Sequence, residues 1–348
     1  MRATRSVTRN PAVSVVCPFY NESAIIEGSI RSLAENLARL DCEWELLVVN
    51  DGSTDGSNDI AQRVAEQNPR VHVLGYSTNK GRGAALLTGI KQARGAIVIT
   101  TEIDLSWGEN IVHDLLGAMR SHPEADVVVA SPHLPGGGYR NVPAKRVWLS
   151  RLGNKVIRAC MADAATMNTG MTRAYRREAI VSLPLHEPGK EFHLEVILKA
   201  TALGLRIHEI PAVLEWKDYK HEGKRMERKS STRVNRLIVS HSLFSLFANP
   251  VRYVWALSFL AFLACLLFLV LAVVFYLSGE VAAYSAIVAL LLLIVAFSLF
   301  VMGVILKQGN MIQRELWALQ SGLMMRSSDS PHAVIGDEDA RSAPPPQP

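Results

Sequence analysis

Two long apolar segments near the C-terminal end constrain this chain more than any other feature of its sequence. Residues 253–279 are 27 consecutive positions without a charged side chain, and residues 281–306 are 26 more after Glu280. Each run exceeds the ~20 residues with which a helix crosses ~30 Å of hydrocarbon. Because the connection between them is short, we expect a transmembrane hairpin with helices at about 253–278 and 281–306. The chain is therefore predicted to be an integral membrane protein.

Positive charges flank the outer ends of this predicted hairpin. Between residues 217 and 236 lie eight basic and three acidic residues, an excess equal to the formal net charge of +5 of the whole chain. Lys307, Arg314 and Arg326 follow the second run, whereas the connecting loop carries only Glu280. By the positive-inside rule, both termini and the domain before the hairpin are expected in the cytosol. A basic block beside a membrane span favours contact with anionic lipid rather than with nucleic acid.

Residues 12–216 alternate between short apolar runs and stretches with helical spacing. This alternation predicts an α/β domain with a doubly wound, mostly parallel sheet, in which ligands bind beyond the carboxyl ends of the strands. Strands are expected at 13–17, 44–49, 71–74, 96–100, 126–130 and 205–210, and helices at 24–40, 60–66, 83–94, 110–121, 145–161, 173–182 and 192–203. The segment 132–143, rich in glycine and proline, is expected to form a loop over the site where ligands bind at the carboxyl edge of the sheet.

The remaining segments complete the predicted organisation. Residues 1–11 form an N-terminal extension, and the first apolar run, 12–17, is too short for the core of a signal peptide. Residues 217–250 form a basic amphipathic segment, within which 227–247 has the pattern of a helix lying in the membrane interface. Residues 308–348 form a cytosolic tail, expected to be disordered from about 327. The four cysteines are scattered without metal-ligand spacing and are interpreted as small apolar residues.

Acidic residues follow several of the predicted strands. They form four clusters, at Asn21-Glu22, Asn50-Asp51, Glu102-Ile103-Asp104 and residues 191–195. Carboxylates gathered at one edge of a sheet repel one another unless a cation or hydrogen-bond donors neutralise them. Hard oxygen ligands suit Mg²⁺ or Mn²⁺, so a divalent metal site is predicted there. The segment Asn79-Lys80-Gly81-Arg82-Gly83-Ala84 opens a predicted helix and is a candidate phosphate-binding place.

These stretches resemble the inverting family 2 glycosyltransferases of the GT-A fold, and among them the polyprenyl-phosphate group typified by dolichyl-phosphate mannose synthase. The resemblance covers roughly residues 12 to 235 in order. It rests on VVCPFYNE at 15–22, VVNDGSTD at 48–55, NKGRGA at 79–84, EIDLS at 102–106, NTGMTRAY at 168–175, FHLE at 192–195 and IHEIP at 207–211.

The resemblance implies the roles of individual residues. The nucleotide-sugar would be bound by Pro18, Tyr20, Glu22, Asp51, Lys80, Glu102, Ile103 and Asp104. Glu102 and Asp104 would hold Mg²⁺ or Mn²⁺ on the diphosphate. The family usually has Asp-x-Asp at this place, and glutamate is one methylene longer while remaining a hard oxygen ligand. Ser106 also stands where many relatives carry a longer polar side chain.

The implied reaction moves one hexose from a UDP- or GDP-sugar to a polyprenyl phosphate. A phosphate monoester has a second pKa of ~6 and is largely anionic at neutral pH, so it needs positioning by cations rather than a strong base. Arg225, Arg228 and Lys229 are the candidate lipid-phosphate ligands, with Arg173 as a further cation and Asp104 as the catalytic metal ligand. Glu195 is either a base or a structural acid.

Two other functions remain open at this point. A glycosyltransferase acting on a lipid hydroxyl would need a real base, which Glu195 could supply. A membrane-tethered homologue could instead bind nucleotide without catalysis, because the Asp-x-Asp pattern is changed. A processive polysaccharide synthase is disfavoured, since two spans do not easily enclose a polymer channel and no Gln-x-x-Arg-Trp stretch is present. The sugar, the polyprenol and the oligomeric state do not follow from the sequence.

Overall fold

A seven-stranded sheet forms the centre of the N-terminal domain. The computed structural model describes residues 11–160, 165–216, 220–221, 224–225 and 250–328 of the chain. The strand order is β3-β2-β1-β4-β7-β5-β8, and every neighbouring pair is parallel except those made by β7. The bounds are β1 (Val13–Phe19), β2 (Trp44–Asp51), β3 (Val71–Tyr76), β4 (Ile97–Thr100), β5 (Val127–Ser131), β7 (Arg173–Arg176) and β8 (Ile207–Pro211). The predicted α/β, mostly parallel sheet is confirmed.

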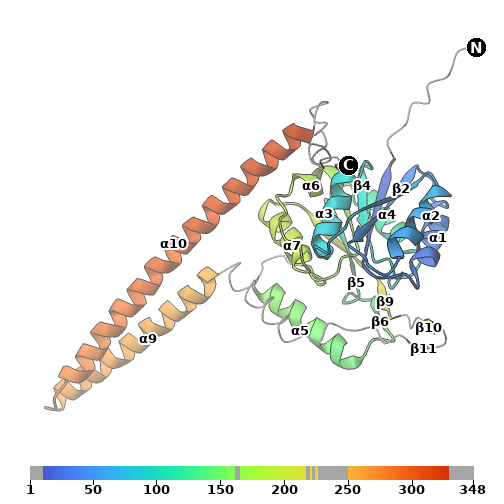
Figure 1. Cartoon of the computed structure of the whole chain (residues 1–348). Helices are drawn as coiled ribbons and strands as arrows, with labels where there is room; N and C mark the ends of the chain where they lie inside the picture. The colour runs from blue at the N-terminus through green and yellow to red at the C-terminus, as the bar shows by residue number, and fades with distance from the viewer. Residues whose placement is uncertain (1–10, 161–164, 217–219, 222–223, 226–249, 329–348) are drawn as a thin grey trace, which may run out of the picture.

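The central strands are buried along nearly their whole length because both faces of the sheet are covered. All eight residues of β2 are buried, and so are six of the seven in β1. Such uninterrupted runs are typical of parallel strands covered by helices on both faces. The helices are α1 (Ile26–Leu37), α2 (Ser57–Glu66), α3 (Arg82–Gln92), α4 (Ile111–Ser121), α6 (Arg177–Ser182) and α7 (Phe192–Ala202), which flank the sheet in Figure 1.

The predicted helix at 173–182 is wrong in its first half. Residues 173–176 form β7, an antiparallel strand inserted between β4 and β5, and the helix α6 begins only at Arg177. Ala174 and Tyr175 are almost fully buried in the sheet. Pairing with strands on both sides therefore overrides the local helical pattern, as tertiary context commonly does for short segments.

A smaller layer lies beside the end of the sheet at which β5 and β8 stop. The segment expected to be a loop at 132–143 contains β6 (Gly138–Arg140), which pairs in parallel with β9 (Val213–Glu215). The helix α5 (Ala144–Cys160) follows, and Arg146 stacks over the ring of Trp216 at 4.5 Å. Figure 1 shows α5 along the side of the domain that carries β6 and β9. Two short strands, β10 (Lys220–His221) and β11 (Lys224–Arg225), pair antiparallel.

Two apolar helices form a hairpin after the domain. They are α9 (Pro250–Leu277) and α10 (Ala283–Ser328), and both are long and apolar enough to cross a membrane. The Ser258 hydroxyl on α9 donates to the carbonyl of Ala296 on α10 at 2.7 Å. Trp255 packs against Phe300 with ring centroids 6.3 Å apart.

The helix α10 extends well beyond the apolar run that predicted it. The second span was expected to end near 306, yet the helix continues without interruption to Ser328, through about half of what was expected to be tail. The expected interfacial helix at 227–247 lies outside the described residues, and so does the part of the tail after 328.

Candidate active site

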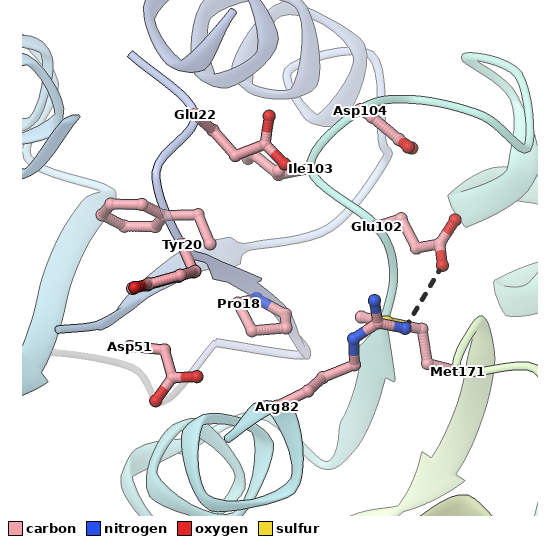
Figure 2. Close-up of a pocket in the computed structure, with 10 residues that line it drawn as sticks. Pro18, Tyr20, Glu22, Asp51, Arg82, Glu102, Ile103, Asp104 and Met171 are labelled. Carbon is pink, nitrogen blue, oxygen red and sulfur yellow. Dashed lines mark ion pairs between the residues drawn. The ribbon is translucent and has the colours of Figure 1, made fainter. Parts of the chain in front are cut away.

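A pocket of about 210 Å³ opens at the carboxyl ends of β1, β2 and β4. The topology explains its position, since parallel strands end at one edge of the sheet and their following loops meet there. The lining residues are Pro18, Phe19, Tyr20, Glu22, Asp51, Arg82, Glu102, Ile103, Asp104 and Met171. Figure 2 shows the labelled side chains converging from the ends of β1, β2 and β4, from the start of α3 and, for Met171, from the segment before β7. Seven of the eight residues predicted to bind the nucleotide-sugar are among them.

The turn after β1 is built from hydrogen bonds to the loop after β2. Asn21 has a φ of 55°, a left-handed conformation that asparagine tolerates better than most residues. Its backbone N–H donates to the Ser53 hydroxyl at 3.0 Å, and the N–H of Glu22 donates to Ser57 at 2.9 Å. The exposed ring of Tyr20 and the carboxylate of Glu22 thereby lie on a fixed turn at the pocket.

Asp51 holds together the loop that opens α3. Its buried carboxylate accepts the Tyr76 hydroxyl at 2.7 Å, and it accepts the backbone N–H groups of Lys80 at 2.9 Å and Gly81 at 3.0 Å. Burial and the hydrogen bond to this carboxylate raise the pKa of the Tyr76 phenol. Asp51 therefore fixes the loop at 76–81 as well as lining the pocket.

The acidic motif after β4 is a rigid turn. Leu105 has a φ of 54°, and the N–H of Ser106 donates to Asp104 Oδ1 at 3.0 Å. The Ser106 hydroxyl donates to Glu102 Oε2 at 2.6 Å. Asp104 is almost fully buried, whereas about a quarter of the Glu102 side chain is exposed. The turn thus presents two carboxylates to one pocket.

Arg82, the first residue of α3, extends across the pocket toward this motif. Its Nη1 lies 3.7 Å from Glu102 Oε1, the ion pair drawn in Figure 2. A guanidinium at a helix N-terminus suits phosphate oxygens, because it can donate two parallel hydrogen bonds where the helix dipole also favours an anion. The candidate phosphate-binding segment 79–84 therefore contributes Arg82 to the pocket.

The predicted metal ligands fit a divalent cation shared with a substrate. No three His, Cys, Asp or Glu side chains among the described residues are grouped so that they could hold an ion by themselves. Glu102 and Asp104 supply two hard oxygen donors at the pocket. Mg²⁺ commonly takes one or two carboxylates and completes its octahedral shell with phosphate oxygens and water. This donor set suits a metal that binds together with a diphosphate.

Two predicted cations lie away from the pocket. The Lys80 ammonium stacks over the Tyr76 ring at 4.8 Å, and Lys80 does not line the cavity. Arg173 is completely buried in β7, where its guanidinium donates to the carbonyls of Asn168 at 2.7 Å and His193 at 3.0 Å. Burial lowers the pKa of Arg173. This position supports a structural role for Arg173 rather than the predicted contact with a lipid phosphate.

Glu195 is held by an ion pair and by backbone hydrogen bonds. It lies on α7, is buried, and pairs with Lys199 at 2.6 Å. It also accepts the backbone N–H groups of His186 at 3.0 Å and Glu187 at 2.9 Å. Of the two roles left open for it, the geometry favours the structural one, because Glu195 does not line the pocket.

The predicted lipid-phosphate ligands are mostly not described. Arg225 ends β11, while Arg228 and Lys229 lie outside the described residues. Three pocket residues, Phe19, Arg82 and Met171, were not among the individual site residues predicted from the sequence. The signal for Arg82 was available, since it stands between the two glycines at the start of α3. Met171 carried no chemical signal and lies in the pocket because its carbonyl accepts the Thr100 hydroxyl at the end of β4.

Comparison with known proteins identifies the family. The family model described as glycosyl transferase family 2 matches residues 14–183. The chain is 33% identical over 208 residues to an undecaprenyl-phosphate mannosyltransferase of Micrococcus luteus, a match covering 57% of this chain and 82% of that one. The chain belongs to glycosyltransferase family 2. This family 2 enzyme is also 30% identical over 207 residues to a polyprenol monophosphomannose synthase of Mycolicibacterium smegmatis, covering 57% of its own chain and 75% of the relative.

Solved structures show the same fold. The crystal structure of glucosyl-3-phosphoglycerate synthase from Mycobacterium tuberculosis, in complex with Mn²⁺, UDP and glucosyl-3-phosphoglycerate, matches with a TM-score of 0.51. That match covers 68% of this chain and 80% of the other at 21% identity. The likeness confirms the GT-A fold of this glycosyltransferase.

Proposed function

We propose that this family 2 glycosyltransferase transfers one hexose from a UDP- or GDP-sugar to a polyprenyl phosphate at the cytosolic face of a membrane. The observation that carries the proposal is the pocket at the carboxyl edge, in which Tyr20, Glu22 and Asp51 face Arg82 and the acidic motif. The two relatives described above, whose names specify polyprenyl-phosphate mannose transfer, support the acceptor class.

The donor would lie with its diphosphate between Arg82 and the acidic motif. Glu102 and Asp104 would hold a divalent cation, which when bound would neutralise charge on the leaving nucleoside diphosphate. Arg82 would then exchange its ion pair with Glu102 for the phosphate oxygens, to which a guanidinium can donate two parallel hydrogen bonds. Tyr20 and Glu22, on the turn after β1, would contact the nucleoside.

A phosphate acceptor fits the position of Glu195. An alcohol must lose its proton as it attacks, whereas a phosphate monoester already carries a nucleophilic oxygen at neutral pH. Glu195, the carboxylate predicted as a possible base, pairs with Lys199 and accepts two backbone N–H groups. The phosphate therefore needs only to be positioned against the anomeric carbon.

The membrane placement is supported by the charges around the hairpin. With α9 and α10 across the bilayer, Lys307 and Arg314 lie at one end and Glu280 at the other, and in the sequence the basic segment 217–236 precedes α9. The helix α5 adds five basic and no acidic residues over Ala144–Cys160, and its Trp148 is 62% exposed. A basic helix with an exposed indole suits a surface of anionic headgroups.

The test is sugar transfer by the full-length protein purified in detergent. UDP- and GDP-sugars would be offered with Mg²⁺ or Mn²⁺ and a short polyprenyl phosphate, and the product would be detected as lipid-linked sugar. We expect a product from one donor, lost when metal is chelated and in Asp104→Asn, which removes a charge while retaining the shape. Product on diacylglycerol but not on polyprenyl phosphate would contradict the acceptor assignment. Nucleotide binding without product on either lipid would contradict the proposed reaction.

A further inference from the structure

The cytosolic end of α10 packs back onto the catalytic domain. Figure 1 shows the helix running from the hairpin to α6, and the two elements are in contact. Trp317 is partly buried and Ser321 is buried in this part of α10. Leu316 and Leu319, which project from another side of the same turns, are 53% and 66% exposed. The domain therefore contacts one side of α10 and leaves the other side open.

Trp317 covers a buried ion pair of the domain. The Lys199 ammonium lies 5.2 Å from the centre of the Trp317 ring. The same ammonium donates to Glu195 Oε1 at 2.6 Å and to the carbonyl of Pro184. An ammonium has three N–H donors, and a buried cation is costly unless it is paired. Two oxygens and one aromatic face thus surround Lys199, and the aromatic face comes from the hairpin.

Backbone hydrogen bonds link the Lys199–Glu195 pair to the pocket. Glu195 fixes the backbone of His186 and Glu187, and the adjacent Pro188 carbonyl accepts the N–H of Ala84 at 3.0 Å. The segment lies so close to the start of α3 that a Cβ on Gly83 would stand 2.3 Å from the Glu187 carbonyl oxygen. Arg82 of the pocket lies between the two glycines that permit this approach, Gly81 and Gly83.

We propose that Trp317 is a positioning residue that couples the seating of α10 on the domain to the donor pocket. Its ring keeps water from the Lys199–Glu195 pair, that pair holds the segment 184–188, and this segment sets the start of α3 and so Arg82. The inference rests on the proposed function only in naming the pocket as the donor site.

The experiment measures nucleotide affinity and donor KM separately in the full-length protein. Trp317→Leu keeps an apolar side chain but removes the aromatic face, and Trp317→Phe retains it. We expect Trp317→Leu to raise both the nucleotide Kd and the donor KM by about threefold to tenfold, with the acceptor KM unchanged. Trp317→Phe should restore most of the affinity. Leu319→Ala, on the open side of α10, is the matched control and should match the wild type.

A double-mutant cycle tests the route. Glu195→Gln breaks the same chain of contacts as Trp317→Leu. The double variant Trp317→Leu/Glu195→Gln should therefore have a nucleotide Kd no higher than that of Glu195→Gln alone. Additive effects, or wild-type nucleotide affinity in Trp317→Leu, would overturn the coupling. If Trp317→Leu does not fold, Trp317→Met, which also lacks the aromatic face, is measured against Glu195→Gln in the same cycle. Nucleotide affinity is read without turnover, so a failed transfer assay would overturn the proposed function while leaving this inference to be judged by Kd.

Discussion

At the scale of single residues, Arg82 offers the sharpest test of how the pocket binds its donor. Arg82 lines the cavity, and its guanidinium lies 3.7 Å from Glu102. We expect Arg82→Met to raise the donor KM about tenfold, because a charged hydrogen bond to the diphosphate is worth ~1.5–3 kcal/mol. Arg82→Lys should recover only part of the donor affinity that Arg82→Met loses, because an ammonium lacks the planar geometry with which a guanidinium donates two parallel hydrogen bonds. Lys91→Met, also on α3 and exposed, is the control, and a wild-type KM in Arg82→Met would contradict the assignment.

The glutamate in the acidic motif makes a second residue-scale prediction. Glu102 differs from the aspartate usual in the family by one methylene, and Ser106 donates to it at 2.6 Å. We expect Glu102→Asp to keep much of the transfer activity, because a hard carboxylate oxygen remains, and Glu102→Gln to lose most of it. Titrating Mn²⁺ against activity checks this, with a weaker apparent metal affinity expected in Glu102→Gln. Equal activity in the two variants would mean that the charge of Glu102 is not needed.

Glu45 makes a prediction about acid stability far from the pocket. Its buried carboxylate accepts Ser14 Oγ at 2.6 Å and Arg94 Nη2 at 2.6 Å. Burial alone would raise the pKa of Glu45, but the hydrogen bonds from Ser14 and Arg94 outweigh it and lower the pKa. The stabilisation is therefore present above the unfolded pKa, near 4.5, and is lost as pH falls through the lower folded value.

Glu45→Gln is expected to destabilise the domain by about 1–3 kcal/mol at pH 7, where the wild-type carboxylate is charged. Between pH 5 and 3 the variant should lose less stability than the wild type, which is measured by thermal unfolding across that range. The exposed Glu66→Gln on α2 is the matched control. Parallel pH profiles for Glu45→Gln and the wild type would contradict the prediction.

At the scale of elements, strands with local apolar signals were predictable and the antiparallel strand was not. The runs that became β1 and β2 are buried on both faces, so their composition alone predicts them, and the polar residues after them necessarily meet at one edge. The sequence of β7 contains Arg173 and Arg176, which indicate an exposed helix. They lie in a strand that pairs with β4 and β5, where the His193 carbonyl accepts from Arg173 and the Ala125 carbonyl accepts from Arg176.

The partners that decide the roles of Glu195 and Lys80 were not predicted from the sequence either. Glu195 is a plausible base by its motif, and only the fold shows that Lys199 and the backbone at 186–187 occupy its oxygens. Lys80 and Arg82 are two positions apart and chemically similar, yet only Arg82 lines the pocket, because Tyr76 holds Lys80. A motif therefore identifies the chemistry of a loop, whereas the choice among its members depends on packing.

The helix α5 carries a prediction about lipid dependence. Its exposed Lys145, Arg151 and Lys155 surround Trp148 on one side of the helix. We expect the triple change of these cations to glutamate to weaken transfer in bilayers containing anionic lipid, because each basic residue near such a surface contributes ~1 kcal/mol. Activity in neutral detergent should be retained. The test compares nanodiscs with and without phosphatidylglycerol, and an equal loss in both bilayers would contradict a contact with headgroups.

At the scale of the whole molecule, the close packing of α9 against α10 depends on one glycine. Gly303 on α10 lies against Trp255 of α9 so closely that a Cβ would stand 2.1 Å from the indole Nε1. Gly303→Val should therefore separate the helices and lower the unfolding temperature in detergent by several degrees. Gly309→Val is a matched control on the same helix, since its Cβ would meet nothing within 4 Å. Similar unfolding temperatures for the two variants would show that the helices do not pack here.

The length of α10 has a consequence for how the enzyme meets its acceptor. Its 46 residues span about 69 Å at ~1.5 Å per residue, more than twice the ~30 Å hydrocarbon core. With the apolar part of α10 across a bilayer, the excess would form a rigid helical connection between the bilayer and the catalytic domain. Acceptor capture then becomes a search in two dimensions, governed by how densely the lipid populates the leaflet. Diluting the vesicles at constant composition should leave the transfer rate per enzyme unchanged, while lowering the mole fraction of polyprenyl phosphate should slow it.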